Sequence, residues 1–136
     1  MAPGASGNSA IRARGLTRRF GRHLALDRVD LDVPAGTTYG LLGENGAGKT
    51  TFIRLVTGFL LPSAGDVEVF GVSTAAQPAA VQKKIGFVME TSRLYPELRV
   101  QAFLRFCGAI RNVGGEALDA VVESAIEHFQ LGSVRE

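Results

Sequence analysis

The sequence has few of the residues that form cross-links. Among its 136 residues there are one cysteine, Cys107, and two histidines, so we expect neither an internal disulfide nor a cluster of soft metal ligands. A single cysteine is most often a small, buried apolar side chain. The absence of a disulfide partner fits a reducing compartment.

Long runs of one chemical character are also missing. No stretch approaches the roughly 20 apolar residues of a membrane span, and MAPGASGNSA at the start lacks the basic and apolar regions of a signal peptide. The 15 basic residues are balanced by 13 acidic ones without a long basic run, so we expect no nucleic-acid partner. With 46% hydrophobic residues, the composition is that of an ordinary globular protein.

The periodicity of apolar and charged residues changes along the chain. Alternating apolar and charged residues predict two antiparallel strands at 10–16 and 25–33, and the less polar 37–42 predicts a strand buried on both faces, as in parallel sheets. Further strands are predicted at 66–70 and 85–89, and helices at 50–57, 79–84, 99–112 and 116–131. Strands followed by helices predict an α/β core and then a helical subdomain.

Residues 43–51, GENGAGKTT, match the phosphate-binding pattern G-x-x-x-x-G-K-[ST]. Their glycines allow positive φ and close approach to an anion, so that successive N–H groups point at it, and a helix beginning near Gly48 adds its positive end. We predict that Lys49 binds the β and γ phosphates, that the Thr50 hydroxyl coordinates Mg²⁺ and that Thr51 contacts the α phosphate. The predicted phosphate contacts are Gly43, Glu44, Asn45, Gly46, Ala47, Gly48, Lys49, Thr50 and Thr51.

The surroundings extend the match beyond this loop. RRFG, then ALDRVDLDVPAGTTYGLLGENGAGKTTFIRLVTGFLLPSAGDVEVFG, then IGFVMETSRLYPELRV resemble the ATP-binding subunit of ABC transporters, over about residues 10–135. The resemblance implies an α/β P-loop NTPase of ABC type, with an antiparallel β subdomain, a partial parallel sheet with helices and the start of a helical subdomain. It also implies ATP and Mg²⁺ as cofactors. The implied partners are a membrane-spanning transporter subunit and a second ATP-binding subunit, at the cytoplasmic face of the cell membrane.

On this resemblance the chain divides into three parts. We expect a flexible tail at residues 1–9, an incomplete ATP-binding α/β core at 10–89, and a Q-loop-like segment with the start of the helical subdomain at 90–136.

Three single residues take their predicted roles from the resemblance. Phe20, followed by Gly21, matches the aromatic residue that stacks on adenine. Glu90 stands where the family has a glutamine that touches Mg²⁺ and water; a carboxylate is still a hard oxygen ligand, and members resembling exporters carry Glu there too. We take Glu90, with Lys49, as a candidate catalytic residue. Arg99 stands where the family often has a threonine N-cap, so the following helix should be weaker by about 1 kcal/mol.

Several family motifs have no match in these residues: the signature sequence, the Walker B strand with its Mg²⁺-binding Asp and catalytic Glu, and the switch His. Hydrolysis needs a positioned water as well as a phosphate cradle. We therefore expect this chain, truncated before those motifs, to bind ATP without turning it over alone.

Two alternatives come from other classes. The chain could be a non-catalytic nucleotide-binding or interaction module that pairs with intact subunits, in which case it should inhibit them. Another Mg-dependent NTPase is disfavoured, because no N-K-x-D base reader of a GTPase is present. The arginines after residue 90 are spaced along a helix, whereas a kinase lid would cluster them.

Overall fold

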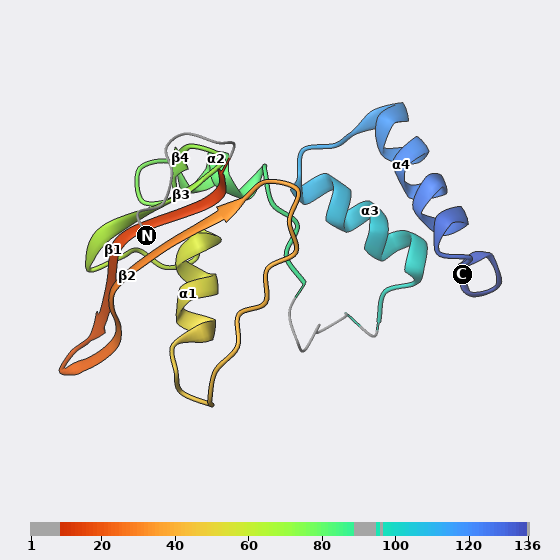
Figure 1. Cartoon of the computed structure of the whole chain (residues 1–136). Helices are drawn as coiled ribbons and strands as arrows, with labels where there is room; N and C mark the ends of the chain where they lie inside the picture. The colour runs from red at the N-terminus through yellow and green to blue at the C-terminus, as the bar shows by residue number, and fades with distance from the viewer. Residues whose placement is uncertain (1–8, 89–94, 96, 136) are drawn as a thin grey trace. The chain divides into compact units, whose positions relative to one another are not determined.

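The structure is a computed structural model that describes residues 9–88, 95 and 97–135 (Figure 1). Contacts between residues divide the chain into two compact units, Met1–Val88 and Met89–Glu136. Among the described residues, no helix has the length and apolar character needed to cross a membrane.

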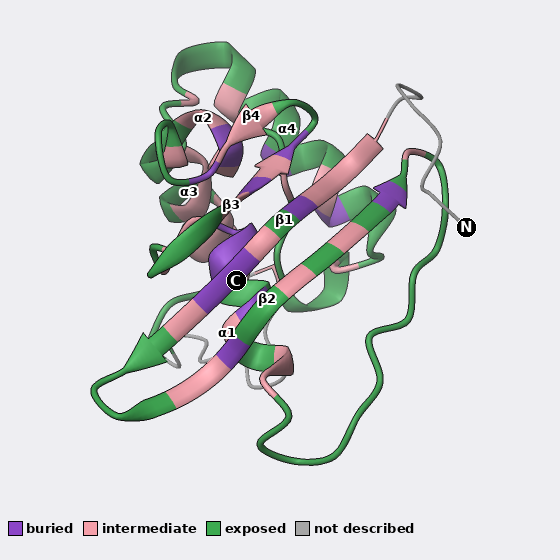
Figure 2. Cartoon of the chain, turned by 60° about the vertical axis from the view of Figure 1, so that its left-hand side comes forward, coloured by how far each residue is buried: buried purple, intermediate pink, exposed green. Residues whose placement is uncertain are grey.

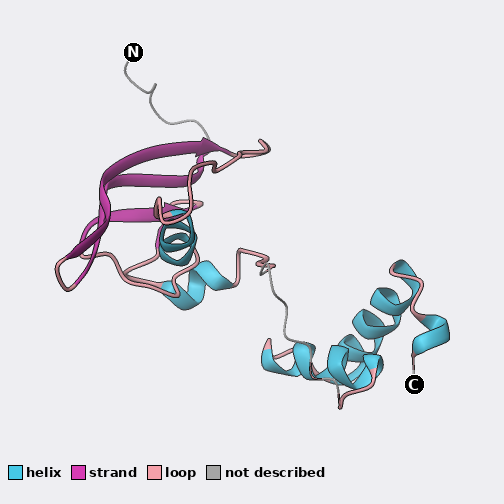
Figure 3. Cartoon of the chain, turned by 90° about the horizontal axis from the view of Figure 1, so that it is seen from below, coloured by secondary structure: helices cyan, strands magenta, loops and turns pink. Residues whose placement is uncertain are grey.

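The first unit is built on a four-stranded antiparallel sheet (Figure 3). Strands β1 (Ser9–Phe20) and β2 (His23–Pro34) form a long hairpin, which confirms the antiparallel pair predicted from their alternation. Strand β3 (Ala64–Val69) pairs with the other edge of β1, and the short β4 (Val72–Ser73) pairs with β3. The strand order is therefore β2-β1-β3-β4.

The core of this unit lies between the sheet and the helices α1 (Lys49–Val56) and α2 (Pro78–Gln82). Buried residues run along β1 and along one side of α1 (Figure 2). As predicted, α1 ends where Gly58 takes a positive φ of 71°. The buried cluster consists of Ala13, Leu16, Leu26, Phe52, Leu55, Val56, Val67, Val69 and Val81.

Among the described residues, two predicted strands are not formed, and neither is the parallel sheet to which they would belong. Residues 37–42 and 85–88 are not strands, while Met89 lies outside the described residues. The first of these segments was expected to be buried on both faces, yet Leu42 is 93% exposed. A strand exists only where a neighbour takes up its backbone hydrogen bonds, and neither segment pairs with another strand among the described residues. The α/β fold class is confirmed, with a wholly antiparallel sheet in the part of the chain that is described.

The second unit contains the helices α3 (Val100–Ile110) and α4 (Gly115–His128) and the short 3₁₀ helix η1 (Gly132–Val134). The two long helices approach closely at Gly108, where an added Cβ would lie 2.3 Å from Leu118 Cδ1. Val122 and Ile126 of α4 are buried, whereas α3 has no buried residue. Arg99 is the N-cap of α3 and its side chain makes no capping hydrogen bond, as predicted.

Candidate functional site

The glycine-rich loop leads directly into α1 (Figure 1). Residues 43–47 are exposed, and Gly48 is the N-cap of the helix in the left-handed conformation, with φ 91°. The helix begins at Lys49, so the N–H groups of Lys49, Thr50 and Thr51 lie in its first turn. These amides have no acceptor in a preceding helical turn, which makes the end of the helix attractive to an anion.

The backbone at Gly48 lies close against strand β2. A Cβ at this position would lie 2.6 Å from the carbonyl oxygen of Ala25 and 2.8 Å from Leu26 Cδ2. Both the positive φ and the lack of space therefore require glycine. The contact fixes the end of the loop to the hairpin.

The Lys49 side chain folds back over the loop. Its Nζ donates hydrogen bonds to the carbonyl oxygens of Gly43, at 2.6 Å, and Glu44, at 2.7 Å. The N–H of Ala47 closes the turn by donating to the Glu44 carbonyl at 3.2 Å. The ammonium group is thereby held above the loop backbone, where a phosphate lying in the loop would meet it.

The loop also presents free backbone donors. In the part of the chain that the structure describes, no residue accepts a hydrogen bond from the N–H groups of Gly46, Gly48 or Lys49. Gly46 and Gly48 both have positive φ, 87° and 91°, a backbone form that turns successive N–H groups toward one concave surface. This arrangement suits a polyphosphate, which offers several acceptors at once.

Thr50 is the residue of this loop best placed for a magnesium ion. It is exposed, and its hydroxyl makes no hydrogen bond with any described residue. Within those same residues no three His, Cys, Asp or Glu side chains gather into a metal-binding group. Mg²⁺ commonly binds through one or two protein oxygens, waters and phosphate oxygens, so the Thr50 hydroxyl fits it as one ligand of a nucleotide-bound ion.

An apolar cavity of about 240 Å³ borders the loop. The sequence did not predict this cavity, because residues 37–42 were expected to form a strand buried on both faces. The cavity is lined by Leu26, Val29 and Leu31 of β2, by Tyr39, Leu41 and Leu42, and by Ala47, Gly48, Lys49 and Phe52.

Phe20 lies at the end of β1, beside the hairpin turn, and is 45% exposed. The Arg18 guanidinium lies over its ring, with Cζ 4.6 Å from the ring centroid. Sequence reasoning missed Arg18, although residues two apart on a strand share a face. Arg18 pairs across the hairpin with Leu26, whose side chain is next to Gly48, so the aromatic residue and the loop are fixed to one stretch of the hairpin.

Glu90, the other predicted site residue, lies outside the described residues. The structure describes the other predicted site residues, the loop at 43–51 and the hairpin residue Phe20, within the first unit.

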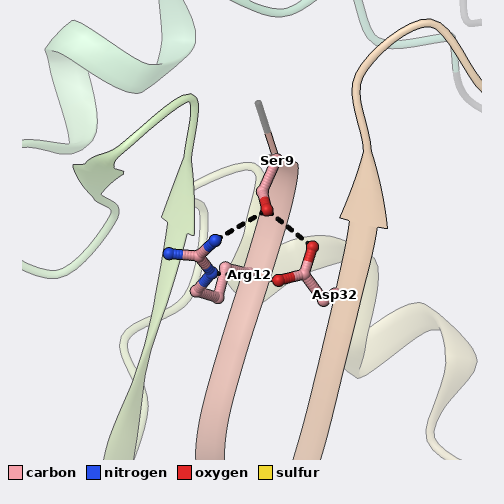
Figure 4. Close-up of polar contacts among 3 residues, drawn as sticks. All are labelled: Ser9, Arg12 and Asp32. Carbon is pink, nitrogen blue, oxygen red and sulfur yellow. Dashed lines mark hydrogen bonds and ion pairs between the residues drawn. The ribbon is translucent and has the colours of Figure 1, made fainter. Parts of the chain in front are cut away.

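A polar cluster occupies the open end of the hairpin (Figure 4). The Ser9 hydroxyl donates to Asp32 Oδ1 at 2.6 Å, and Arg12 Nε donates to Asp32 Oδ2 at 3.1 Å. Arg12 Nη2 also donates to the Ser9 hydroxyl at 2.8 Å. The hydrogen bonds from Ser9 and Arg12 lower the pKa of the Asp32 carboxyl from its usual value. The cluster joins β1 to β2 and lies at the end of the hairpin remote from Phe20.

Comparison with known proteins gives one consistent family. The family model described as "ABC transporter" matches residues 26–136. The chain is 33% identical over 131 residues to "Probable multidrug ABC transporter ATP-binding protein YbhF" of Escherichia coli (strain K12), covering 96% of this chain and 23% of that protein. It is 36% identical over 124 residues to "Daunorubicin resistance ATP-binding protein DrrA3" of Streptomyces coeruleorubidus, covering 91% and 39%.

A solved structure shares the fold. "Structure of ATP binding subunit of ABC transporter" superposes with a TM-score of 0.77 at 24% identity, covering 93% of this chain and 53% of that one. The chain spans between 23% and 39% of the lengths of the two curated relatives.

Proposed function

Because this chain belongs to the ABC transporter family, in which its relatives are ATP-binding proteins, we propose that its first unit binds Mg-ATP through the loop at residues 43–51. The observation that carries the proposal is the geometry of that loop. The N–H groups of Gly46, Gly48 and Lys49 have no acceptor among the described residues, and the Lys49 ammonium is bonded to the Gly43 and Glu44 carbonyls of the same loop. A site that combines backbone donors with one mobile cation is chemically matched to a polyphosphate.

Binding exchanges hydrogen bonds at Lys49. The Nζ group gives up the carbonyl oxygens of Gly43 and Glu44 and donates to the β and γ phosphate oxygens, which carry more charge. The backbone donors need no such release, since no described residue accepts from them. The loop is therefore ready to accept the anion before the lysine moves.

The remaining contacts with Mg-ATP involve four other residues. The Thr50 hydroxyl would hold Mg²⁺, and the Thr51 hydroxyl would donate to the α phosphate. The ion, when bound, neutralises the charge on the phosphates. Glu90 supplies a further oxygen ligand, and the Phe20 ring stacks on the adenine.

We further propose that these residues form one part of a larger assembly. The chain binds ATP, and sustained turnover needs further residues, because hydrolysis requires a positioned water as well as a phosphate cradle. Hydrolysis belongs to a pair of ATP-binding subunits at the cytoplasmic face of the membrane, where it energises transport by a membrane-spanning subunit.

The experiment is calorimetric titration of the chain with Mg-ATP. We expect Lys49→Ala to weaken binding by at least tenfold. The matched control is Lys84→Ala, which removes another lysine of the same unit from an exposed position. Equal affinity in the wild type and Lys49→Ala would overturn the proposed phosphate site, and equal losses in the two variants would reduce it to an effect of net charge.

A further inference from the structure

We propose that Arg18 positions the Phe20 ring for adenine, and thereby adds to the recognition of the base. This inference rests on the proposed nucleotide binding and assigns a role to a residue outside the phosphate loop. The guanidinium lies over the ring, with Cζ 4.6 Å from the centroid, which is the geometry of a cation–π contact.

A hydrogen bond to another loop fixes the guanidinium. Arg18 Nη1 donates to the carbonyl oxygen of Leu61 at 2.8 Å. That loop is itself joined to β1, because Ser63 N–H donates to the Thr17 carbonyl at 2.8 Å and its hydroxyl accepts from Arg19 N–H at 3.0 Å. The cation is thus anchored to the body of the first unit.

Hydrogen bonds satisfy only part of the Arg18 guanidinium. Arg18 Nε is buried and donates to no described residue, and an unpaired buried donor costs stability. The contact with the Phe20 ring is the other interaction of this group. The placement of the arginine is therefore best explained by the ring that it covers.

Covering one face of Phe20 has two consequences. The ring, which would otherwise turn freely at the end of a hairpin, is held in one orientation, and this lowers the entropy lost when a base stacks on it. The residue is still 45% exposed, so surface remains for a ligand.

The placement suits one molecule that carries both a base and phosphates. Arg18 pairs with Leu26, which is next to Gly48 of the phosphate loop. Phe20 is two residues further along the strand, a distance of about 7 Å at the usual rise per residue. The Phe20 ring and the loop at residues 43–51 are therefore both tied to the same stretch of the hairpin.

The test separates base recognition from phosphate binding. The chain is titrated with ATP and with inorganic tripolyphosphate, both with Mg²⁺. We expect Arg18→Met to weaken ATP binding about three- to tenfold and to leave tripolyphosphate binding within about twofold. Arg19→Met is the matched control, because it removes an adjacent charge whose side chain is exposed, and it should change neither affinity.

A double-mutant cycle distinguishes positioning from a merely structural role. In a Phe20→Leu background Arg18→Met should have no further effect on ATP, because the ring that it positions is gone. Loosening of the loop at Leu61 would instead persist in that background. Independent, additive losses overturn the inference, as do equal losses in Arg18→Met and Arg19→Met.

A measurement without nucleotide completes the test. The Arg18 side-chain protons should show upfield NMR shifts from the Phe20 ring, and Phe20→Leu should abolish them. If these shifts are absent, the inference fails while the proposed function stands. If the wild type binds neither ATP nor tripolyphosphate, the proposed function fails, and the inference fails with it.

Discussion

Amphipathic patterns occur in both units of the chain, but the two units bury very different numbers of apolar residues. In the first unit a sheet and two helices enclose one continuous core of nine buried residues. In the second unit two helices of comparable amphipathic pattern bury only Val122 and Ile126. Large apolar side chains therefore remain exposed on the second unit, among them Phe106, Ile110, Val121 and Phe129.

The two units differ in the area of neighbouring structure against which each helix packs. A helix on a sheet is covered along a wide stripe, whereas two helices touch along one narrow seam. The phosphate loop is attached to the unit with the larger core, through Gly48 on one side and α1 on the other. The residues proposed to hold an anion thus belong to the unit with the larger buried core.

The largest expected effect is a matched truncation in each unit. Leu55 is fully buried, and Leu55→Ala should destabilise the first unit by about 3–5 kcal/mol, through lost burial and a residual cavity. Ile126→Ala should cost the second unit about 2 kcal/mol, because a shallow seam collapses more readily. Amide hydrogen exchange in β1 and α4 measures each loss separately. Equal losses would show that the two cores are equivalent.

A smaller loss is expected at the contact between loop and hairpin. Gly48→Ala should destabilise the first unit by about 1–3 kcal/mol, because the new Cβ meets the Ala25 carbonyl in a strained backbone conformation. It should also weaken Mg-ATP binding in the calorimeter. Gly46→Ala is the control, since its φ is also positive but no atom lies within 4 Å of the added Cβ. Similar losses at the two glycines would mean that backbone strain alone, without the contact, sets the cost.

The second unit should gain stability from a better helix start. Arg99 is the N-cap of α3 without a capping hydrogen bond. Arg99→Ser supplies an oxygen that accepts from a first-turn N–H, so α3 should gain about 0.5–1 kcal/mol in exchange protection. Arg111→Ser, at the C-cap, has no such N–H to accept from and should give no gain. A gain from both substitutions would contradict capping as the cause.

The smallest effect concerns pH and belongs to the first unit. The pKa of Asp32 is lowered in the folded chain by the hydrogen bonds from Ser9 and Arg12. Its stabilising contribution is therefore present above the usual aspartate pKa of about 4 and is lost as the pH falls through the lower folded value. An NMR titration of the Asp32 carboxyl carbon should show the low pKa, and Ser9→Ala should raise it toward the usual value. An unchanged pKa in that variant would assign the shift to Arg12 alone.

Local patterns predicted much of this fold. The alternation in β1 and β2, the helical spacing in α3 and α4 and the glycine that ends α1 could all be read from neighbouring residues. The capping defect at Arg99 followed from side-chain chemistry in the same way. The loop pattern and its flanking segments also identified the family.

Other features depended on residues far apart in the chain. The strand pattern at 37–42 and 85–88 was strong, but a strand needs a partner for its backbone, and none pairs with them among the described residues. The contact of Gly48 with Ala25 and the anchoring of Arg18 by Leu61 likewise join distant segments.

The sequence by itself thus determined which chemical groups the loop at residues 43–51 and its neighbours contain and which short elements carry them. Only the tertiary structure decided what those groups face: the carbonyls that hold Lys49, the hairpin beneath Gly48 and the cation over Phe20. The physical reason is that periodicity and turn chemistry act over a few residues, whereas packing depends on which segments the folded chain brings together.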